Sequence, residues 1–266
     1  MKKGARLGQH FLKARWAATM LARESGAKKG ETIVEIGPGK GVLTRELLRL
    51  GAKVIAIEID GALIPILKEK FTDEIASGTL TLIHADIMDD SVTMEQFGFE
   101  GNDYRVAANI PYYITGAIIR GFLSICRKPK SMTLLVQKEV AERIAKSKKE
   151  SILSLSVKAY GTPRYVKTVS RSCFSPAPRV DSAIMSIEKI SDFFFDDIRE
   201  EFFFEIIKRG FSSKRKLLVN NLSHAYDKSK VTAACAACNI PEKARAEDVS
   251  LEKWKCVAQN LSLSTR

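Results

Sequence analysis

The chain has 266 residues, 45% of them hydrophobic, which is enough to bury the core of one large domain or of a main domain with a smaller one. No apolar run approaches the roughly 20 residues of a membrane-spanning helix, and no apolar segment follows the basic residues 1–6 as in a secretory signal peptide. A cytoplasmic, monomeric protein without a membrane partner is therefore expected. The formal net charge of +12 favours a polyanionic partner.

The positive charge is unevenly distributed along the chain. Residues 1–30 contain eight Lys or Arg against one acid, and residues 120–171 contain thirteen against three. Residues 31–119 between them contain seven against fourteen. An acidic segment flanked by basic ones predicts that a nucleic acid binds through the flanks.

Helix and strand patterns alternate from the start of the chain. A helix is predicted over residues 13–26, where Trp16, Met20 and Leu21 are spaced for one face. Strands are then predicted at 32–36, 54–58, 80–84, 105–108 and 132–137, and helices at 42–50, 62–71, 115–124, 138–146 and 151–160. This alternation predicts an α/β, Rossmann-like fold, in which helices cover both faces of a mostly parallel sheet.

The pattern changes after Gly161. Strands are predicted at residues 164–170 and 182–188 with no crossover helix between them, so they should pair antiparallel at the sheet edge. From Ser191 onward only helical patterns follow, near 194–209, 213–224, 228–238 and 247–261. The sequence thus predicts a cofactor-binding catalytic domain over residues 1–190 and a small all-helical domain over 191–266.

The cysteines do not suggest a disulfide framework, because there are five of them. Cys235 and Cys238 form a single C-x-x-C in an alanine-rich run, with no second pair at zinc-site spacing, and are interpreted as small buried residues. The three histidines are scattered. No metal site is expected.

Four predicted strands end in a polar side chain, namely Glu35, Glu58, Asp86 and Asn109. In a doubly wound sheet the carboxyl ends of the strands line one crevice, and ligands bind there. We therefore expect these four side chains to share one pocket.

A glycine-rich turn follows the first of these strands. Its spacing, with Gly37, Gly39 and Gly41, is G-x-G-x-G, which differs from the dinucleotide fingerprint G-x-G-x-x-G and from a Walker A loop. Glu35 before the first glycine disfavours a pyrophosphate and suits a cationic ligand. Glu58 at the second strand end can accept both hydroxyls of a ribose. These features predict S-adenosylmethionine; a nicotinamide-dependent enzyme is the alternative.

The segment Asn109-Ile110-Pro111-Tyr112 follows the strand at residues 105–108. An amide oxygen on Asn109 can accept a hydrogen bond from an amine, Pro111 stiffens the turn, and the ring of Tyr112 can stack on a base. The same residues would also suit a turn that merely ends a strand.

Five segments in order resemble the S-adenosylmethionine-dependent ribosomal RNA adenine N6,N6-dimethyltransferases, a family of Rossmann-like class I methyltransferases. They are residues 7–12 (LGQHFL), the glycine loop 35–41, the motif 109–112, residues 173–183 (CFSPAPRVDSA) and residues 211–222. His10 stands where the family commonly has Asn. The resemblance implies methyl transfer to the N6 amines of adjacent adenosines in a small-subunit rRNA hairpin, within the immature subunit, during ribosome biogenesis.

The resemblance also implies roles for individual residues. The implied cofactor-binding residues are Gln9, His10, Leu12, Gly37, Gly39, Glu58, Asp86, Ile87 and Asn109. The implied catalytic residues are Asn109, Ile110, Pro111, Tyr112 and Phe174, with Tyr112 and Phe174 sandwiching an adenine unstacked from its helix. The RNA phosphates are expected on Lys138, Arg143, Lys146, Lys148, Lys149, Lys214, Arg215 and Lys216.

Two alternatives remain open at this point. An Erm-like methyltransferase, which acts on large-subunit rRNA and confers antibiotic resistance, shares the cofactor loop and the Asn109 motif. A ribosome-assembly factor, in which binding matters more than methylation, would share the basic segments.

Overall fold

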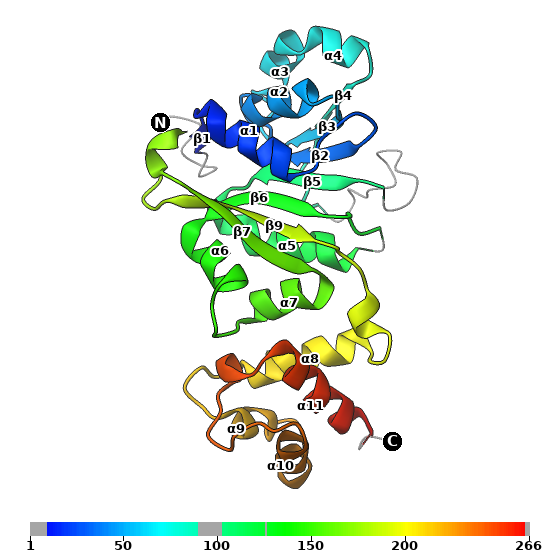
Figure 1. Ribbon diagram of the computed structural model, residues 1–266, viewed down its shortest axis with the longest axis vertical. Helices are drawn as coiled ribbons and strands as arrows, with labels where there is room; N and C mark the ends of the chain where they lie inside the picture. Colours follow the sequence, from blue (N-terminus) through cyan, green and yellow to red (C-terminus); the bar gives the residue numbers. More distant parts are fainter. Residues whose placement is uncertain (1–9, 90–102, 126, 264–266) are drawn as a thin grey trace. The chain divides into compact units, whose positions relative to one another are not determined.

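The computed structural model describes residues 10–89, 103–125 and 127–263. The chain forms two compact units (Figure 1). The first unit contains Met1–Glu142 and Gly161–Ile190, and the second contains Arg143–Tyr160 and Ser191–Arg266. The second unit therefore begins after Ile190, near the boundary expected from sequence, but it also includes residues 143–160, which the sequence pattern placed with the sheet.

The first unit is built on a seven-stranded sheet of order β4-β3-β2-β5-β6-β9-β7. β4, β3, β2, β5 and β6 run parallel, and β9 pairs antiparallel with β7, as predicted; β9 also pairs antiparallel with β6. The strand bounds are β2 Thr32–Ile36, β3 Lys53–Glu58, β4 Leu80–His84, β5 Arg105–Asn109, β6 Met132–Gln137, β7 Thr162–Val169 and β9 Ser182–Glu188. β2, β3, β5, β6 and β9 are almost wholly buried, which is typical of strands covered on both faces.

Helices precede, connect and follow the parallel strands. They are α1 Arg15–Glu24, α2 Val42–Arg49, α3 Ile64–Lys70, α4 Thr72–Ala76, α5 Thr115–Ser124 and α6 Lys138–Ala145. The prediction for α1 was wrong in one respect. Its buried face consists of Ala17, Ala18, Leu21 and Ala22, whereas Trp16 is 47% exposed, because the small alanines allow close packing against the rest of the core.

A two-stranded ribbon, which the sequence analysis did not predict, joins the N-terminal segment to a distant loop. β1 (Phe11–Leu12) pairs antiparallel with β8 (Phe174–Ser175). The Lys13 amide also donates to the Cys173 carbonyl at 2.9 Å. This ribbon brings the segment around His10 beside the segment around Phe174, although more than 160 residues of chain separate them.

The second unit is helical around one apolar core. Its helices are α7 Ile152–Tyr160, α8 Glu200–Gly210, α9 Leu218–Leu222, α10 Lys228–Ala237 and α11 Leu251–Leu263. The helix predicted from residue 194 begins at Glu200. A short 3-10 turn, Phe193–Phe195, precedes it, and Phe194 and Phe195 pack edge-on against Phe203 there. The sequence pattern predicted the first turn of a helix here, but the chain forms a 3-10 turn in which these rings pack together.

The structure corrects the prediction for the cysteines. Cys238 is bonded to Cys256, with an S–S distance of 2.08 Å, while Cys235 is a free buried thiol. The bond links the end of α10 to α11. Spacing alone did not reveal it, because the partners are 18 residues apart and belong to different helices.

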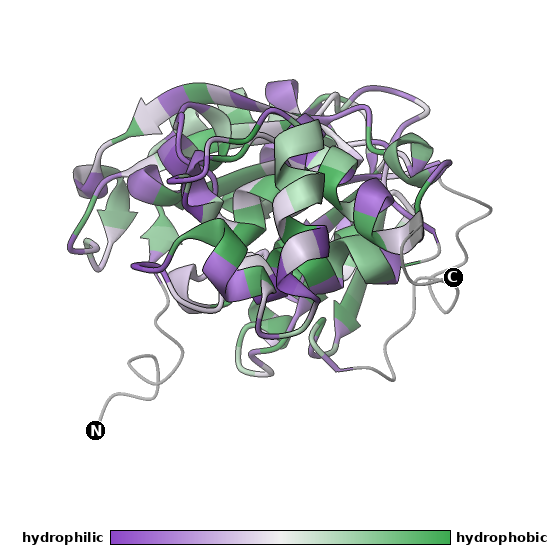
Figure 2. Ribbon diagram, turned by 90° about the horizontal axis from the view of Figure 1, so that it is seen from below, coloured by the Kyte–Doolittle hydropathy of each residue, from purple (hydrophilic) through white to green (hydrophobic). Residues whose placement is uncertain are grey.

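Colouring by hydropathy shows where apolar and hydrophilic residues lie along the ribbon (Figure 2). The visible strands are largely apolar, and many connecting loops are hydrophilic. Among the described residues, no helix combines the length and the apolar content that crossing a bilayer requires.

Candidate active site

The four polar strand ends meet in one pocket of the first unit, as predicted. The pocket has a volume of about 280 Å³ and includes Glu35, Glu58, Asp86 and Asn109 in its lining. Their strands β4, β3, β2 and β5 are direct neighbours and run parallel, so their carboxyl ends lie at the same edge of the sheet. The crevice inferred from the strand pattern is therefore present.

The glycine loop is shaped by backbone conformations that other residues rarely adopt. Gly37, Gly39 and Gly41 all have positive φ, at 64°, 57° and 70°. The Gly37 amide donates to the Ile57 carbonyl at 2.9 Å, which ties the loop to β3. No neighbour lies within 4 Å of a Cβ added at Gly37, so the pocket side of the loop is open to a ligand.

Glu58 holds the loop from the end of β3. Its side chain is 2% exposed; one oxygen, Oε2, accepts from the Gly39 amide and the other, Oε1, from the Asp60 amide, both at 2.9 Å. A carboxylate oxygen has further lone pairs after accepting one such bond. Glu58 is thus fixed in place and still able to accept ribose hydroxyls.

Glu35 lies one strand away and is 1% exposed. Burial in the protein, followed in importance by the negative charge of Glu58, raises the pKa of Glu35 from its usual 4.5 to about 8; Thr44 and Lys70 act against this shift. Burial therefore favours the neutral, protonated form of Glu35.

The amide of Asn109 is oriented by the N-terminal segment. Its Nδ2 donates to the backbone carbonyl of His10 at 3.2 Å, which leaves Oδ1 as the atom available to a ligand in the pocket. His10 is in turn held by Nδ1, 2.8 Å from the Pro176 carbonyl. The backbone of His10 therefore positions Asn109.

Four Phe and Tyr side chains line the pocket, namely Phe11, Tyr112, Tyr113 and Phe174. They differ in how far they are exposed to solvent. The hydroxyl of Tyr112 lies 2.7 Å from Ser182 Oγ, and burial raises the pKa of this phenol. Phe174 is 2% exposed and belongs to the apolar core. Tyr113, which the sequence analysis did not select, is 68% exposed. Its position next to Tyr112 was the only signal that could have identified it.

The sequence-predicted site residues divide into three groups. Every expected cofactor-binding and catalytic residue within the described part of the chain lines the pocket, whereas Gln9 falls outside the described residues. The pocket lining also includes Lys40, Ile59 and Met88, which were not predicted. The expected RNA-binding residues lie elsewhere.

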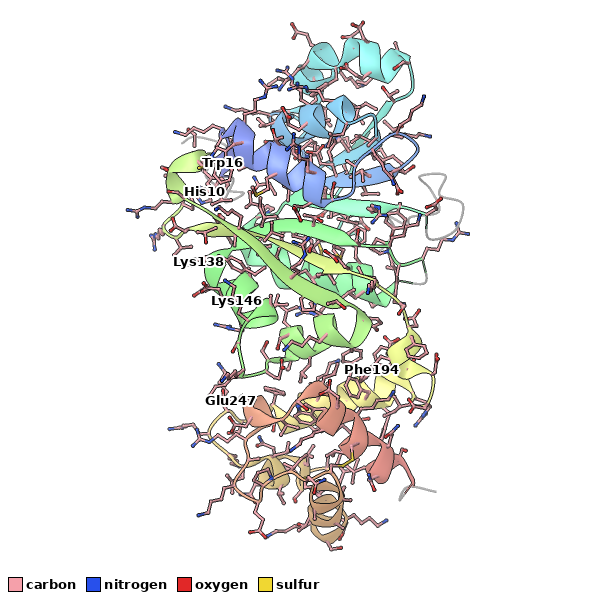
Figure 3. All side chains as sticks on the ribbon, viewed as in Figure 1. His10, Trp16, Lys138, Lys146, Phe194 and Glu247 are labelled. Atoms are coloured by element: carbon pink, nitrogen blue, oxygen red, sulfur yellow. A yellow bond between two sulfur atoms is a disulfide. The ribbon has the colours of Figure 1, made fainter. Side chains whose placement is uncertain are left out.

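Most of the expected RNA-binding side chains are exposed. Figure 3 labels Lys138 and Lys146, at the start of α6 and just after its end. Lys138 lies 3.9 Å from Glu142, and Lys149 forms an ion pair with Glu247, so neither charge is free of a neighbouring acid. The exposed members are Arg143, Lys146, Lys148, Lys149, Lys214, Arg215 and Lys216.

The structure corrects the local setting of the last three of these residues. Lys214, Arg215 and Lys216 were expected to open a helix, but α9 begins at Leu218, so they occupy the turn before it. Lys216 Nζ lies 3.3 Å from His224 Nε2. The turn is tied to the end of α8, because the Asn221 amide donates to the carbonyls of Gly210 and Ser213.

A doubly wound sheet with an antiparallel edge pair, and a pocket with acids and an amide at four strand ends, define a Rossmann-like methyltransferase. The chain belongs to the ribosomal RNA adenine dimethylase family, whose model matches residues 1–262.

Two relatives named ribosomal RNA small subunit methyltransferase A illustrate the similarity. The protein from Dehalococcoides mccartyi (strain BAV1) is 39% identical over 94% of this chain and 85% of its own length. That from Alkaliphilus oremlandii is 34% identical over 96% and 91%. Among solved structures, a dimethyladenosine transferase from Plasmodium falciparum has a TM-score of 0.78 at 25% identity, covering 96% of this chain and 98% of its own. The 23S rRNA methyltransferase ErmE shares the fold, with a TM-score of 0.74 at 24% identity over 95% and 99%.

Proposed function

We propose that this protein transfers methyl groups from S-adenosylmethionine to the N6 amines of adjacent adenosines in a small-subunit rRNA hairpin, giving N6,N6-dimethyladenosine. The observation that carries the proposal is the oriented amide of Asn109, in a pocket that also contains Glu58 and Asp86. The relatives at 34–39% identity are small-subunit enzymes, which supports this substrate over the large-subunit rRNA of the Erm-like alternative.

The pocket residues fit S-adenosylmethionine without any phosphate group. Glu58 accepts the ribose hydroxyls, Asp86 accepts from the adenine amine and Ile87 packs on the adenine ring. The backbone around His10 and Leu12, with Gly37 and Gly39 opposite, encloses the methionine end; Gln9 is assigned there from the sequence alone. A buried oxygen of Glu35, without a hydrogen-bond partner in the described part of the chain, favours a cationic ligand.

The bound cofactor supplies an electrophilic methyl group, so the protein's task is to position the adenine amine. That amine is a poor nucleophile, because its lone pair is delocalised into the ring. Asn109 Oδ1 and the Ile110 carbonyl accept the two amine hydrogens and favour a pyramidal nitrogen. Asn109 is neutral, and after the first methylation its Oδ1 can still accept the one hydrogen that remains on the amine. This arrangement is compatible with a second transfer. Pro111 holds the turn that carries both acceptors.

Aromatic side chains hold the unstacked base. Tyr112 forms one wall, fixed through Ser182. Phe174 belongs to the β1–β8 ribbon, is 2% exposed and lines the same pocket, where it forms part of the opposite wall. Tyr113 is the exposed aromatic of the pocket lining, and it extends the stacking surface towards the RNA.

Replacement of Tyr113 by Ala is expected to weaken RNA binding by about 1–3 kcal/mol, roughly 5- to 150-fold, because base–aromatic stacking has this magnitude. Tyr113→Phe should retain nearly all of the affinity, since the ring remains. The measurement is the Kd for a substrate hairpin, repeated with an abasic target nucleotide. If Tyr113 stacks on the target base, the Ala and Phe variants bind the abasic hairpin equally; a persistent difference would refute that contact.

The exposed basic side chains hold RNA phosphates and so position the RNA without reading its bases. Among them are the exposed residues Lys146 and Lys148, just after α6, and Lys214 and Arg215, just before α9. Lys138 in the first unit, and Arg143, Lys149 and Lys216 in the second, add positive charge to their own units. Lys149 contributes less, because Glu247 compensates its charge.

The proposed function is tested by incubating the protein with labelled S-adenosylmethionine and under-methylated small subunits, and with large-subunit rRNA in parallel. Label recovered as N6,N6-dimethyladenosine from the small subunit supports it. Label in the large-subunit rRNA supports the Erm-like alternative, and label on another base or on protein refutes the proposal. The assembly-factor alternative predicts that a methylation-deficient Asn109→Ala chain still restores subunit maturation in cells.

A further inference from the structure

Glu35 is a buried acid of the pocket, and one of its two carboxyl oxygens is unsatisfied among the described residues. It lines the pocket from the middle of the sheet, on β2, with 1% of the residue exposed. Its Oε2 has no hydrogen-bond partner in the part of the chain that the structure describes. An orphaned carboxyl oxygen in such a position is costly unless the group stays protonated or a ligand completes its environment.

The charged groups around Glu35 do not supply that partner. Glu58 lies on the adjacent strand β3 and repels a negative charge, whereas Lys70 on α3 attracts one. Lys70 Nζ is itself bonded to the Lys40 carbonyl. Thr44 on α2 also favours the ionised form, although its Oγ1, like Glu35 Oε2, has no partner within hydrogen-bonding geometry among the described residues. The other titratable side chains of the lining are His10, Lys40, Asp86, Tyr112 and Tyr113.

A cation brought into the pocket changes this balance. An opposite charge within a few ångströms favours the ionised form of a carboxyl group, most strongly where water is excluded. S-adenosylmethionine has two positive groups at its methionine end, a sulfonium and an ammonium. Either would supply the charge that the buried carboxylate lacks.

We propose that Glu35 is the counter-charge for the positively charged methionine end of the cofactor and that it loses its proton when the cofactor binds. This inference rests on the proposed function. The proton leaves the Glu35 carboxyl group for bulk water, and the complex gains an ion pair between the carboxylate and the cationic ligand. Cofactor binding and proton release are then one linked event.

The linkage has a defined sign. In the cofactor-free protein, burial raises the pKa of Glu35 to about 8. Below this pH, Glu35 must therefore lose its proton when the cofactor binds. Affinity should therefore rise with pH, by about tenfold per pH unit well below the pKa, and level off above it. A group that merely shapes the loop would give no such slope.

The test is calorimetric titration of the full chain with S-adenosylmethionine at about pH 6.5, in buffers that differ in ionisation enthalpy. At this pH the ligand's own amine stays protonated, since α-amino groups titrate near about 8. We expect release of about one proton per cofactor bound by the wild type and by Glu69→Gln, an exposed control on α3. Glu35→Gln should bind with no proton release and with a flat pH dependence.

Two further ligands identify the charge that Glu35 meets. S-adenosylhomocysteine retains the ammonium without the sulfonium, and methylthioadenosine has neither. Proton release with S-adenosylhomocysteine assigns the ammonium, and its absence there assigns the sulfonium; both support the proposal. Equal release with methylthioadenosine overturns it, as does release that persists in Glu35→Gln, which would point to another group such as His10.

An infrared measurement covers the case in which Glu35→Gln does not fold. With isotope-labelled glutamate, the free wild-type chain should show the C=O band of a buried carboxylic acid, and S-adenosylmethionine should abolish it. A band that persists in the complex overturns the proposal. Failure of S-adenosylmethionine to bind at all would instead refute the proposed function, whereas binding without proton release refutes only the role of Glu35.

Discussion

Replacing Asn109 by Ala is expected to lower kcat for dimethyladenosine formation by on the order of 10²–10³-fold, the range found when one preorganised hydrogen-bonding group is removed from an active site. The variant loses the Oδ1 acceptor that orients the adenine amine. The effect on cofactor affinity should be much smaller, because Glu58, Asp86 and the glycine loop remain. The measurements are single-turnover methyl transfer, with dimethyladenosine quantified after digestion of the RNA, and the Kd for S-adenosylmethionine.

Asn109→Asp is the matched control, because it keeps an acceptor at Oδ1 but removes the Nδ2 donor that holds the side chain to the His10 carbonyl. Its activity should lie between those of the wild type and Asn109→Ala. If Asn109→Ala retained wild-type kcat, the amine would be positioned by the Ile110 carbonyl alone. If cofactor affinity and kcat fell together, Asn109 would act mainly on the cofactor.

The pocket was predictable from sequence where the information is local. The apolar strands around Glu35, Glu58 and Asn109 end where their residue patterns end, and parallel pairing then brings the carboxyl ends to one edge of the sheet. Eleven of the expected elements, among them β2, β4 and α5, have the predicted bounds or differ by one residue at one end. In such segments, short-range periodicity and tertiary structure agree.

Other features depend on contacts that no local pattern encodes. The β1–β8 ribbon is only two residues long on each side, and it joins Phe11 to Ser175. The same long-range pairing buries Phe174, which its loop-like sequence did not indicate. The hydrogen bond from Asn109 to the His10 carbonyl spans 99 residues of chain, so the orientation of the catalytic amide was not accessible from the motif alone.

Substitution of Gly41 by Ala is expected to lower the free energy of unfolding by about 2–5 kcal/mol. The positive φ of 70° costs about 1–2 kcal/mol for a residue with a Cβ. Overpacking adds about 1–3 kcal/mol, because the new Cβ would lie 2.4 Å from Phe71 Cε2 and 3.1 Å from Leu67 Cδ2. Both neighbours are buried in the core, so they cannot swing into solvent. Urea unfolding followed by circular dichroism measures the loss.

Two other glycines separate the causes of this loss. Gly78 has a φ of 72° with nothing within 4 Å of an added Cβ, so Gly78→Ala should show the cost of the backbone alone, about 1–2 kcal/mol. Gly37→Ala should match Gly78→Ala in stability, because nothing lies within 4 Å of its added Cβ either. Since Gly37 also lines the pocket, the added methyl group is expected to weaken binding of S-adenosylmethionine. Equal stability of the Gly41 and Gly78 variants would show that Phe71 yields without cost. Unchanged cofactor affinity of Gly37→Ala would show that the ligand does not approach this loop.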